Sequence, residues 1–337
     1  MIKIDQIWQC PLCNGKLTVD NETNFCCIQC KSIYPAIHNI PDFRTTPWTA
    51  AKKDRFKEIN RIQTLISRFH SCSYNELVEI HLSMIDGRPG ILGDLDRRLR
   101  LSAIQRGKNK FEQLQSLLTS CNVQNLLNGI ILEIGSGTGD MLPHISKNAS
   151  FVIAIDVSMD LLILAQKLII SQGLTNIVLA CASADRLPII SDKIDFLYAS
   201  HVIEHLTDQK MSVKQFHRVL KRDGTIFFDS PNRFSISYEP HVQLLGVGYL
   251  PRFLMNSYVR LMRKIPYSNK RLLSYFELRR LLRRKIWRYN IYRHEVHIKF
   301  NYASLKNRIY RVLIKCIPGI IQKYIFSETF FVLAQKK

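Results

Sequence analysis

Four cysteines near the start of the chain have the spacing of metal ligands. They form two Cys-x-x-Cys pairs, Cys10 with Cys13 and Cys27 with Cys30. Such a pair suits a tight turn that directs both sulfurs inward, and four thiolates complete the tetrahedral shell of a structural zinc ion. Cys26 is a fifth thiol, but only Cys27 gives the two-residue spacing. We therefore predict Zn²⁺ bound by the two pairs, over the alternative of small buried cysteines without a metal.

A second group of residues suits a nucleotide cofactor. A continuous apolar run over 130–134, typical of a buried parallel strand, leads directly into a turn with three glycines. Glycine lets the backbone turn sharply and approach a ligand closely because no Cβ intervenes. A second apolar run, over 151–156, ends in an acid that could accept hydrogen bonds from ribose hydroxyls. These residues alone fit either a dinucleotide or S-adenosylmethionine. The candidates are Glu133, Gly135, Gly137, Gly139 and Asp156.

Three later blocks favour one of these cofactors. They are Ala-Ser-Ala-Asp-Arg-Leu-Pro at 182–188, the strand and His-Val-Ile-Glu-His-Leu at 194–206, and the helix and glycine turn at 216–225. In order and spacing, residues 128–232 resemble the class I S-adenosylmethionine-dependent methyltransferases and not the dehydrogenases. The sugar- and quinone-modifying members carry a similar Glu-His-Leu after the fourth strand. The resemblance implies S-adenosylmethionine as cofactor and a Rossmann-like, seven-stranded α/β core.

The resemblance also implies roles for single residues. Glu133 occupies the position of an acid near the cofactor's amino group, the glycines line its methionine and ribose, and Asp156 binds the ribose hydroxyls. Ser183, Ala184 and Asp185 lie where the family contacts adenine. The usual acid of that turn falls on Ser183, and Asp185 is two positions later, so either side chain could hold the exocyclic amine.

Two histidines follow the fourth predicted strand, at the edge where such folds bind ligands. His201 and His205 could each act as a general base, because histidine titrates near neutral pH, and Glu204 could orient either of them. The alternative is that they cap or pack a helix, and an amine acceptor would need no base at all. Glu239 and His241, in the segment after the fifth strand, are further candidates for the substrate site.

The elements that position these residues divide the chain into three predicted parts. Residues 1–44 form the zinc ribbon, 45–128 a helical connector or lid, and 129–337 the methyltransferase core with a substrate-side insert at about 232–325. In the connector, apolar residues every three or four positions predict a helix over 51–69 and another around Phe111. Gly87 to Gly90 predict a loop between them, Ser274 and Glu277 a capping box, and Thr329 to Ala334 the last strand.

The ribbon has a resemblance of its own. Cys-Pro-Leu-Cys-Asn-Gly-Lys-Leu, Cys-Ile-Gln-Cys, Tyr-Pro and Ile-Pro-Asp-Phe, within residues 7–43, resemble a small zinc-ribbon family that includes activator subunits of RNA and protein methyltransferases. The same ribbon occurs fused to bacterial methyltransferases. The resemblance implies a structural role or a contact with a protein partner.

Charge is concentrated near the C-terminus. The formal net charge is +21, and residues 250–315 hold 18 Lys or Arg against two acidic residues, a net of +16, with eleven aromatic residues among them. Such a segment attracts polyanions, either an anionic membrane surface or RNA; the alternative is a solvated basic face. The sequence lacks a long apolar run and a signal peptide, so we expect a cytoplasmic protein, peripheral to the membrane if it binds lipid.

These features predict methyl transfer from S-adenosylmethionine to a small-molecule or lipid-linked acceptor at the membrane surface. An RNA methyltransferase is the weaker alternative, because the Asn/Asp-Pro-Pro-Tyr signature of many base-methylating enzymes is replaced by Ser-His-Val-Ile at 200–203. A third alternative is a non-catalytic, cofactor-binding activator subunit.

Overall fold

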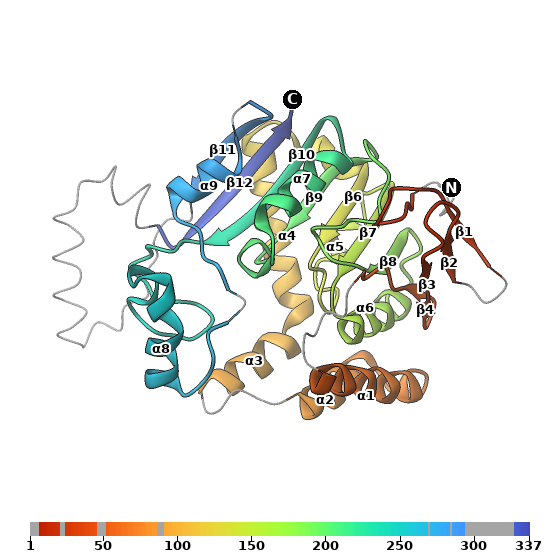
Figure 1. Cartoon of the computed structure of the whole chain (residues 1–337), viewed down its shortest axis with the longest axis horizontal. Helices are drawn as coiled ribbons and strands as arrows, with labels where there is room; N and C mark the ends of the chain where they lie inside the picture. The colour runs from red at the N-terminus through yellow and green to blue at the C-terminus, as the bar shows by residue number, and fades with distance from the viewer. Residues whose placement is uncertain are drawn as a thin grey trace. The chain divides into compact units, whose positions relative to one another are not determined.

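The computed structural model describes residues 7–20, 24–45, 52–85, 91–268, 270–283, 285–293 and 327–337. Its central feature is a seven-stranded sheet in the order β11-β12-β10-β9-β6-β7-β8 (Figure 1). The chain divides into two compact units, one of residues 1–198, 211–226 and 336, and the other of residues 199–210, 227–335 and 337.

Buried apolar residues explain the parallel part of the sheet. Strand β6 pairs in parallel with β7 on one side and with β9 on the other, and β7 pairs in parallel with β8. Ile131, Val152 and Phe196 are fully buried, as expected of strands covered on both faces. The strands are β6 (Ile130–Ile134), β7 (Phe151–Asp156), β8 (Ile177–Cys181), β9 (Ile194–Ala199), β10 (Leu220–Pro231), β11 (Trp287–Arg293) and β12 (Thr329–Lys336).

The N-terminal segment is a small β region in the first unit. Three short antiparallel strands form one sheet and two more form a hairpin. Phe43 is 1% exposed, and the rings of Trp8, Phe25 and Tyr34 lie 5.4, 5.2 and 5.5 Å from it, centre to centre. The strands are β1 (Leu17–Val19), β2 (Phe25–Cys27), β3 (Ile33–Tyr34), β4 (Ala36–Ile37) and β5 (Ile40–Pro41).

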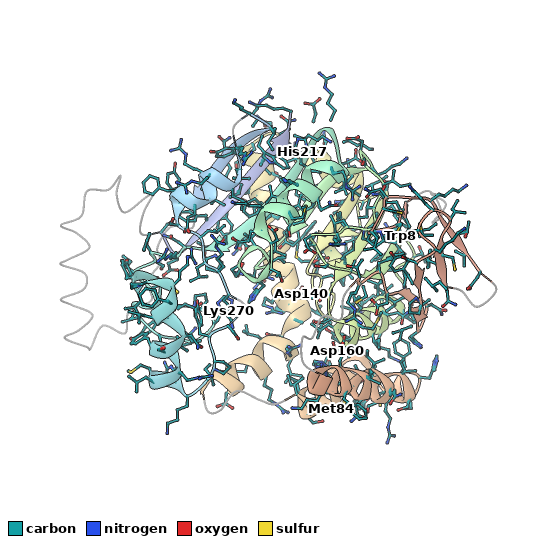
Figure 2. The ribbon with its side chains drawn as sticks, viewed as in Figure 1. Trp8, Met84, Asp140, Asp160, His217 and Lys270 are labelled. Carbon is teal, nitrogen blue, oxygen red and sulfur yellow. The ribbon has the colours of Figure 1, made fainter. Side chains whose placement is uncertain are left out.

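Helices of the first unit follow this region. Helices α1 and α2 contact each other and α6, and Figure 1 shows them side by side. Their link to α6 includes Asp160, which accepts hydrogen bonds from Arg61 at 2.6 Å and pairs with His81 at 3.1 Å (labelled in Figure 2). The helices are α1 (Lys52–Arg68), α2 (Tyr74–Met84), α3 (Ile91–Leu101), α4 (Ala103–Ser120), η2 (Gln124–Asn128), α5 (Leu142–Ile145) and α6 (Met159–Ser171).

The second unit has a core of its own. Val242, Val247, Met255, Val259 and Tyr267 are buried together, and they join the loop after β10 to helix α8. Helix α9 begins at a capping box in which Ser274 and Glu277 bond each other's backbone amides. The other helices among the described residues are η3 (Ile203–His205), η4 (Val247–Tyr249), α8 (Arg252–Arg263) and α9 (Tyr275–Leu281), together with α7 (Gln209–Val219), most of which belongs to the first unit.

The fold class predicted from the sequence is confirmed, as are the capping box at Ser274 and the final strand, which runs as β12. The helix expected over 51–69 is α1, but the expected apolar face is only partly buried. Phe56 is 77% and Ile59 is 42% exposed, because α2 and α6 cover the other end of that face. The predicted loop at 87–90 lies outside the described residues. The three-part division of the chain stays a prediction.

Candidate functional site

The four predicted zinc ligands lie together. The sulfurs of Cys10 and Cys30 are 3.5 Å apart, those of Cys13 and Cys27 are 3.4 Å apart, and all four lie within 4.8 Å of one another. Sulfurs each bonded to one zinc ion at about 2.3 Å lie about 3.8 Å apart in a tetrahedron. The four sulfurs therefore fit one tetrahedral ion closely, and Zn²⁺ is the ion that this donor set favours.

Two tight turns hold these sulfurs in place. The Asn14 amide donates to the Cys10 carbonyl, and the Lys31 amide donates to the Cys27 carbonyl, with both turn residues at positive φ of about 60°. The Gly15 amide also points at the Cys13 sulfur, 3.4 Å away. Amide donors stabilise the thiolate form that metal binding requires.

Cys26 is excluded from this cluster. Its thiol is directed to the Asp20 carboxylate, 3.7 Å away, on the exposed side of the strand. Neighbouring residues of a strand point to opposite faces, so Cys27 faces the cluster and Cys26 cannot. Of the two neighbouring cysteines, the one selected by spacing is therefore the one that lies in the cluster.

The ribbon pairs with the edge of the central sheet within the first unit. The Phe43 amide donates to the Cys181 carbonyl of β8 at 2.7 Å, and the Gln9 amide donates to Pro188 at 2.9 Å. Arg44 forms ion pairs with Asp42 and Glu58, both at 2.7 Å. An exposed sheet edge is thereby covered, so the ribbon is built into the unit that carries the glycine turn.

The glycine turn is fixed to the end of β7. One carboxylate oxygen of Asp156 accepts the amide of Gly137 at 2.8 Å, and the other accepts the amide of Ser158 at 2.9 Å. Gly135, Gly137 and Gly139 all have positive φ, of 72°, 53° and 83°, where glycine is the residue without strain. Each carboxylate oxygen retains lone pairs for further donors, as ribose binding would need.

Glu133 is a buried acid beside this turn. It is 2% exposed, and its Oε2 has no hydrogen-bond partner among the described residues. Burial, with the nearby charge of Asp140, raises its pKa well above the ordinary value. A buried acceptor without a donor is costly, so the position suits a ligand that brings a donor or a positive charge. An ammonium group near Glu133, as expected for the cofactor, would supply both.

Helix α4 lies against the glycine turn. Arg106 and Lys110 approach the Asp140 carboxylate at 3.3 and 3.6 Å, and Gly107 between them is buried. Tyr74 of α2 donates to the carbonyl of Thr138 at 3.4 Å. Helices α2 and α4, in the predicted connector, therefore contact the turn that would bind the cofactor.

The predicted adenine contacts form a short turn after β8. The Ser183 hydroxyl donates to Asp185 at 2.5 Å, and Ala182 is bonded through its amide to the Asp156 carbonyl at 3.0 Å. Ala184 is 8% exposed. The structure thus brings Ser183 and Asp185 together as one polar pair beside the end of β7, and either still suits the exocyclic amine.

In the second unit, a group of histidines and acids surrounds the short helix η3. Glu204 is 1% exposed, and neither of its carboxylate oxygens has a hydrogen-bond partner among the described residues. Its Oε1 lies 3.8 Å from His241 Nε2 and 3.9 Å from His201 Nδ1. The Nε2 atoms of His205 and His241 are 3.1 Å apart. Burial raises the pKa of Glu204 to about 8.

His201 is held at the end of β10. Its amide donates to Asp229 Oδ1 at 2.6 Å, and its ring Nδ1 lies 3.5 Å from the same oxygen. Ser200 donates to the other oxygen at 2.6 Å. His201 has a φ of 54°, a left-handed conformation that non-glycine residues adopt at a cost of about 1–2 kcal/mol, and the two bonds to Asp229 offset it. Its side chain is 52% exposed, so the ring can meet a substrate.

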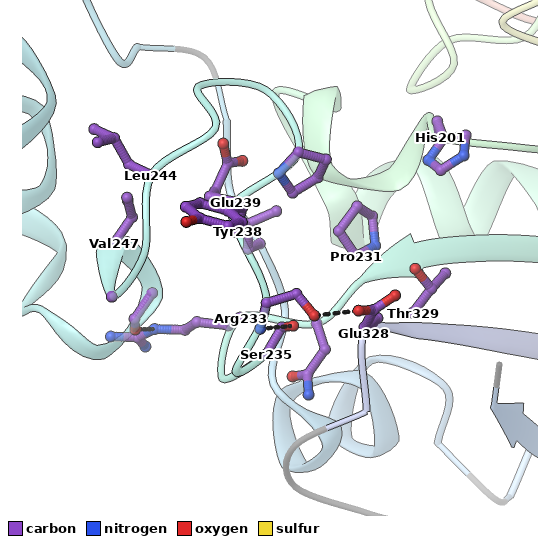
Figure 3. Close-up of a pocket in the computed structure, with 16 residues that line it drawn as sticks. His201, Pro231, Arg233, Ser235, Tyr238, Glu239, Leu244, Val247, Glu328 and Thr329 are labelled. Carbon is purple, nitrogen blue, oxygen red and sulfur yellow. Dashed lines mark hydrogen bonds between the residues drawn. The ribbon is translucent and has the colours of Figure 1, made fainter. Parts of the chain in front are cut away.

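A pocket of about 120 Å³ lies within the second unit, and Figure 3 shows its walls. His201 and Glu239 line it, with Arg233 and Glu328 on other sides. Arg233 donates to the carbonyls of Gly248 and Leu250, so its guanidinium anchors the loop after β10. The pocket thus brings together His201, predicted as catalytic, and Glu239, considered as a substrate residue.

Sequence reasoning missed the part played by Asp229. The available signal was the one that identified Asp156, an acid at the carboxyl end of a buried strand. The closeness of His205 to His241 could not be foreseen from the sequence, because the two residues are 36 positions apart.

Part of the chain is similar to known proteins. Residues 132–228 match the family model described as a methyltransferase domain. The chain is 27% identical over 135 residues to malonyl-[acyl-carrier protein] O-methyltransferase of Hamiltonella defensa, covering 38% of this chain and 50% of that protein. It is 29% identical over 110 residues to ubiquinone/menaquinone biosynthesis C-methyltransferase of Blochmanniella pennsylvanica, covering 31% and 43%.

A solved structure, the YcgJ protein of Bacillus subtilis, aligns with a TM-score of 0.41 and 16% identity, covering 62% of this chain and 91% of that one. The chain spans half or less of the length of the two curated relatives above. Residues 132–228 match a methyltransferase domain, and the seven-stranded α/β fold class predicted from the sequence is confirmed.

Proposed function

We propose that this protein transfers a methyl group from S-adenosylmethionine to a hydroxyl group of a small-molecule or lipid-linked acceptor. The observation that carries the proposal is the glycine turn of a matched methyltransferase domain, bonded through Gly137 to Asp156 and lying beside the buried Glu133. S-adenosylmethionine supplies an activated methyl group on a sulfonium, and the protein supplies alignment and electrostatics. Asp156 would hold the ribose, Glu133 the ammonium group, and Ser183 or Asp185 the adenine amine.

The second unit supplies the proposed acceptor site. A hydroxyl acceptor must lose its proton as the methyl group arrives, and His201 is the residue best placed to take it. Its ring lines the pocket, and Asp229 lies 3.5 Å from Nδ1, where a carboxylate orients the ring and stabilises the imidazolium. Glu204 is less suited to this role, because a carboxyl with a pKa of about 8 is mostly protonated at neutral pH. His205 remains a candidate base through its contact with His241.

The named relatives agree with a small-molecule or carrier-linked acceptor, although neither name specifies a hydroxyl group. One is named for O-methylation of malonyl-acyl-carrier protein and one for C-methylation in quinone biosynthesis. Both names describe acceptors other than nucleic acid. A small or lipid-linked molecule is therefore the first acceptor class to test for this chain, ahead of nucleic acid.

Helix α8 is the proposed membrane contact. Phe253 is 80% exposed and Leu261 is 78% exposed, and they lie eight residues apart, on one face of the helix. Arg260 and Lys264 are exposed near its C-terminal end. An exposed apolar face bordered by basic side chains suits the surface of an anionic bilayer. None of the described helices combines the length and the apolar composition that crossing a bilayer requires.

The test is an acceptor screen with radiolabelled S-adenosylmethionine and the purified protein, using bacterial lipid extracts, soluble metabolite extracts and total RNA. We expect label in the lipid or the metabolite fraction, and a strong loss of it in His201→Ala. Label in RNA alone would replace the proposed acceptor class by the RNA alternative. Binding of S-adenosylmethionine without transfer to any fraction would favour the activator-subunit alternative.

A further inference from the structure

The group around Glu204 in the second unit contains three side chains that share one small space. One carboxylate oxygen of Glu204 and one nitrogen each of His205 and His241 lie within 4.8 Å of one another. Two residues come from η3 and one from the loop after β10. Two imidazoles and one carboxylate are a common ligand set for a divalent transition-metal ion, with positions left for water or substrate.

We propose that Glu204, His205 and His241 bind a divalent transition-metal ion, at a site separate from the four-cysteine cluster.

The distance between the two imidazoles supports this site. Nitrogens bonded to one ion at about 2.0–2.1 Å lie about 3.0 Å apart at adjacent octahedral positions and about 3.3 Å apart at tetrahedral ones. The Nε2 atoms of His205 and His241 are 3.1 Å apart. Their rings meet edge to face at 84°, so the two nitrogens converge on one point instead of stacking.

The environment of His241 fixes the ring form that a metal needs. Its Nδ1 lies 2.6 Å from Glu239 Oε1, which leaves Nε2 to face His205 and Glu204. Glu239 is itself fixed, because Tyr267 donates to Oε1 at 3.2 Å and the Val242 amide donates to Oε2 at 2.8 Å. A carboxylate on the far nitrogen of a ligating histidine orients the ring and increases its basicity.

Glu204 supplies a second, independent observation. Its carboxyl group is 1% exposed, and both oxygens lack a hydrogen-bond partner among the described residues, although two histidine nitrogens lie within 3.9 Å. Burying such a group without partners is costly. A cation held between Glu204 and the two imidazoles would remove that cost by giving the carboxylate a charge to coordinate.

The site borders the pocket through Glu239 and His201, which line it. A bound ion would therefore be positioned to polarise an acceptor hydroxyl, and this role rests on the proposed function. Binding of the ion does not depend on that role. Metal binding can be measured without S-adenosylmethionine or an acceptor. A failure of the metal site can therefore be told apart from a failure of the proposed methyl transfer.

The test is titration of the full-length, zinc-loaded protein with Co²⁺. Cobalt(II) binds N/O sites but ranks below Zn²⁺ in affinity, so it should leave a zinc-filled thiolate cluster intact. We expect one equivalent of bound Co²⁺ by equilibrium dialysis, with visible d–d absorption and without the near-ultraviolet bands of cobalt–thiolate bonds. Those bands would report the cysteine cluster separately.

Three variants and a control locate the ion. We expect His241→Ala to abolish the added equivalent, Glu204→Gln to weaken it more than tenfold, and Glu239→Gln to weaken it by about 10- to 100-fold. His70→Ala, an exposed histidine of the other unit, should bind as the wild type does. Circular dichroism and the melting temperature check folding, with His241→Gln as a second variant if His241→Ala is unstable. No Co²⁺ bound beyond the zinc site, or variants that bind like the wild type, would overturn the proposal.

Discussion

A Cβ atom added to Gly107 would lie 1.8 Å from the backbone carbonyl oxygen of Asp140. Helix α4 is thus packed directly on the backbone that continues the glycine turn. Arg106 and Lys110, on the same helix, pair with the Asp140 side chain. The position of the proposed cofactor loop therefore depends on a helix that precedes the core in the chain.

Gly107→Ala tests this dependence. Alanine inside a helix normally stabilises it by about 0.5–1 kcal/mol relative to glycine. If position 107 were uncrowded, the variant would therefore be more stable than the wild type. Here the clash is with backbone and cannot be relieved by a side-chain rotation. We expect the free energy of unfolding to fall by about 1–3 kcal/mol and S-adenosylmethionine affinity to fall with it. Denaturant melts measure the free energy of unfolding and calorimetry measures S-adenosylmethionine affinity, with Lys108→Ala, exposed on the same helix, as the control. A Gly107→Ala variant as stable as the wild type would contradict the close packing of α4 on Asp140.

Asp160 predicts how stability depends on pH. Burial raises the pKa of this carboxyl, but the hydrogen bonds and charges of His81 and Arg61 outweigh burial and lower it to about 2. Because its pKa is lower in the folded state, the ionised Asp160 carboxylate stabilises the fold at pH values above its unfolded pKa of about 3.9. This contribution is lost as the pH falls toward 2. We expect about 2–3 kcal/mol to be lost across that window.

Asp160→Asn isolates this contribution. The variant should be less stable at neutral pH, by about 3 kcal/mol, because two basic partners lose a buried counter-charge, and its stability should change less between pH 4 and 2. Urea melts at a series of pH values measure both effects, with the exposed Asp208→Asn as control. Equal pH profiles for Asp160→Asn and the wild type would show that the pair does not govern acid stability.

The neighbouring thiols Cys26 and Cys27 provide a matched pair for the zinc site. Cys27 belongs to the four-sulfur cluster, whereas Cys26 is directed to Asp20. We expect Cys27→Ser to lose the zinc and to expose Trp8, which is 2% exposed and packs on Phe43. Cys26→Ser should keep the metal, and its tryptophan emission spectrum should match that of the wild type. Elemental analysis and emission spectra measure this, and zinc retained in Cys27→Ser would refute the ligand set.

The exposed face of α8 predicts binding to anionic vesicles. Replacing Phe253 and Leu261 by serine removes two apolar side chains, each worth about 1.5–3 kcal/mol when fully buried. We expect the double variant to bind phosphatidylglycerol-containing vesicles at least tenfold more weakly in a sedimentation assay. Phe276→Ser, on α9 and 63% exposed, serves as control. Equal binding of the double variant and the wild type would remove α8 as the membrane contact.

Much of the first unit follows from local sequence signals. Apolar strands that end in glycines or an acid identified the turn at Gly135 and the position of Asp156, and cysteine spacing selected Cys27 over Cys26. These signals work because each depends on a few neighbouring residues. The burial of α1 was predicted less well, because Phe56 has the same periodicity as Leu65 but no element of the described chain covers it.

The histidine group of the second unit shows where sequence reasoning stops. His205 was identified by its place after a strand, but its partner His241 depends on how the loop after β10 folds back. That path is set by long-range contacts. The Gln209 side chain donates to the Arg271 carbonyl at 2.9 Å, and the Arg271 amide donates to the backbone carbonyl of Glu204 at 2.7 Å. Contacts between residues so far apart in sequence leave no periodic pattern.

The central claim is that Asp156 and the glycine turn bind S-adenosylmethionine. The direct measurement is isothermal titration of S-adenosylmethionine and, separately, NAD into the wild type, Asp156→Ala and the exposed control Asp223→Ala, with melting temperatures recorded for each. We expect micromolar binding of S-adenosylmethionine only, weakened about 100-fold in Asp156→Ala through loss of charge-assisted ribose hydrogen bonds, and unchanged in Asp223→Ala. A folded Asp156→Ala that binds as the wild type does, or a wild type that binds NAD instead, would contradict the account.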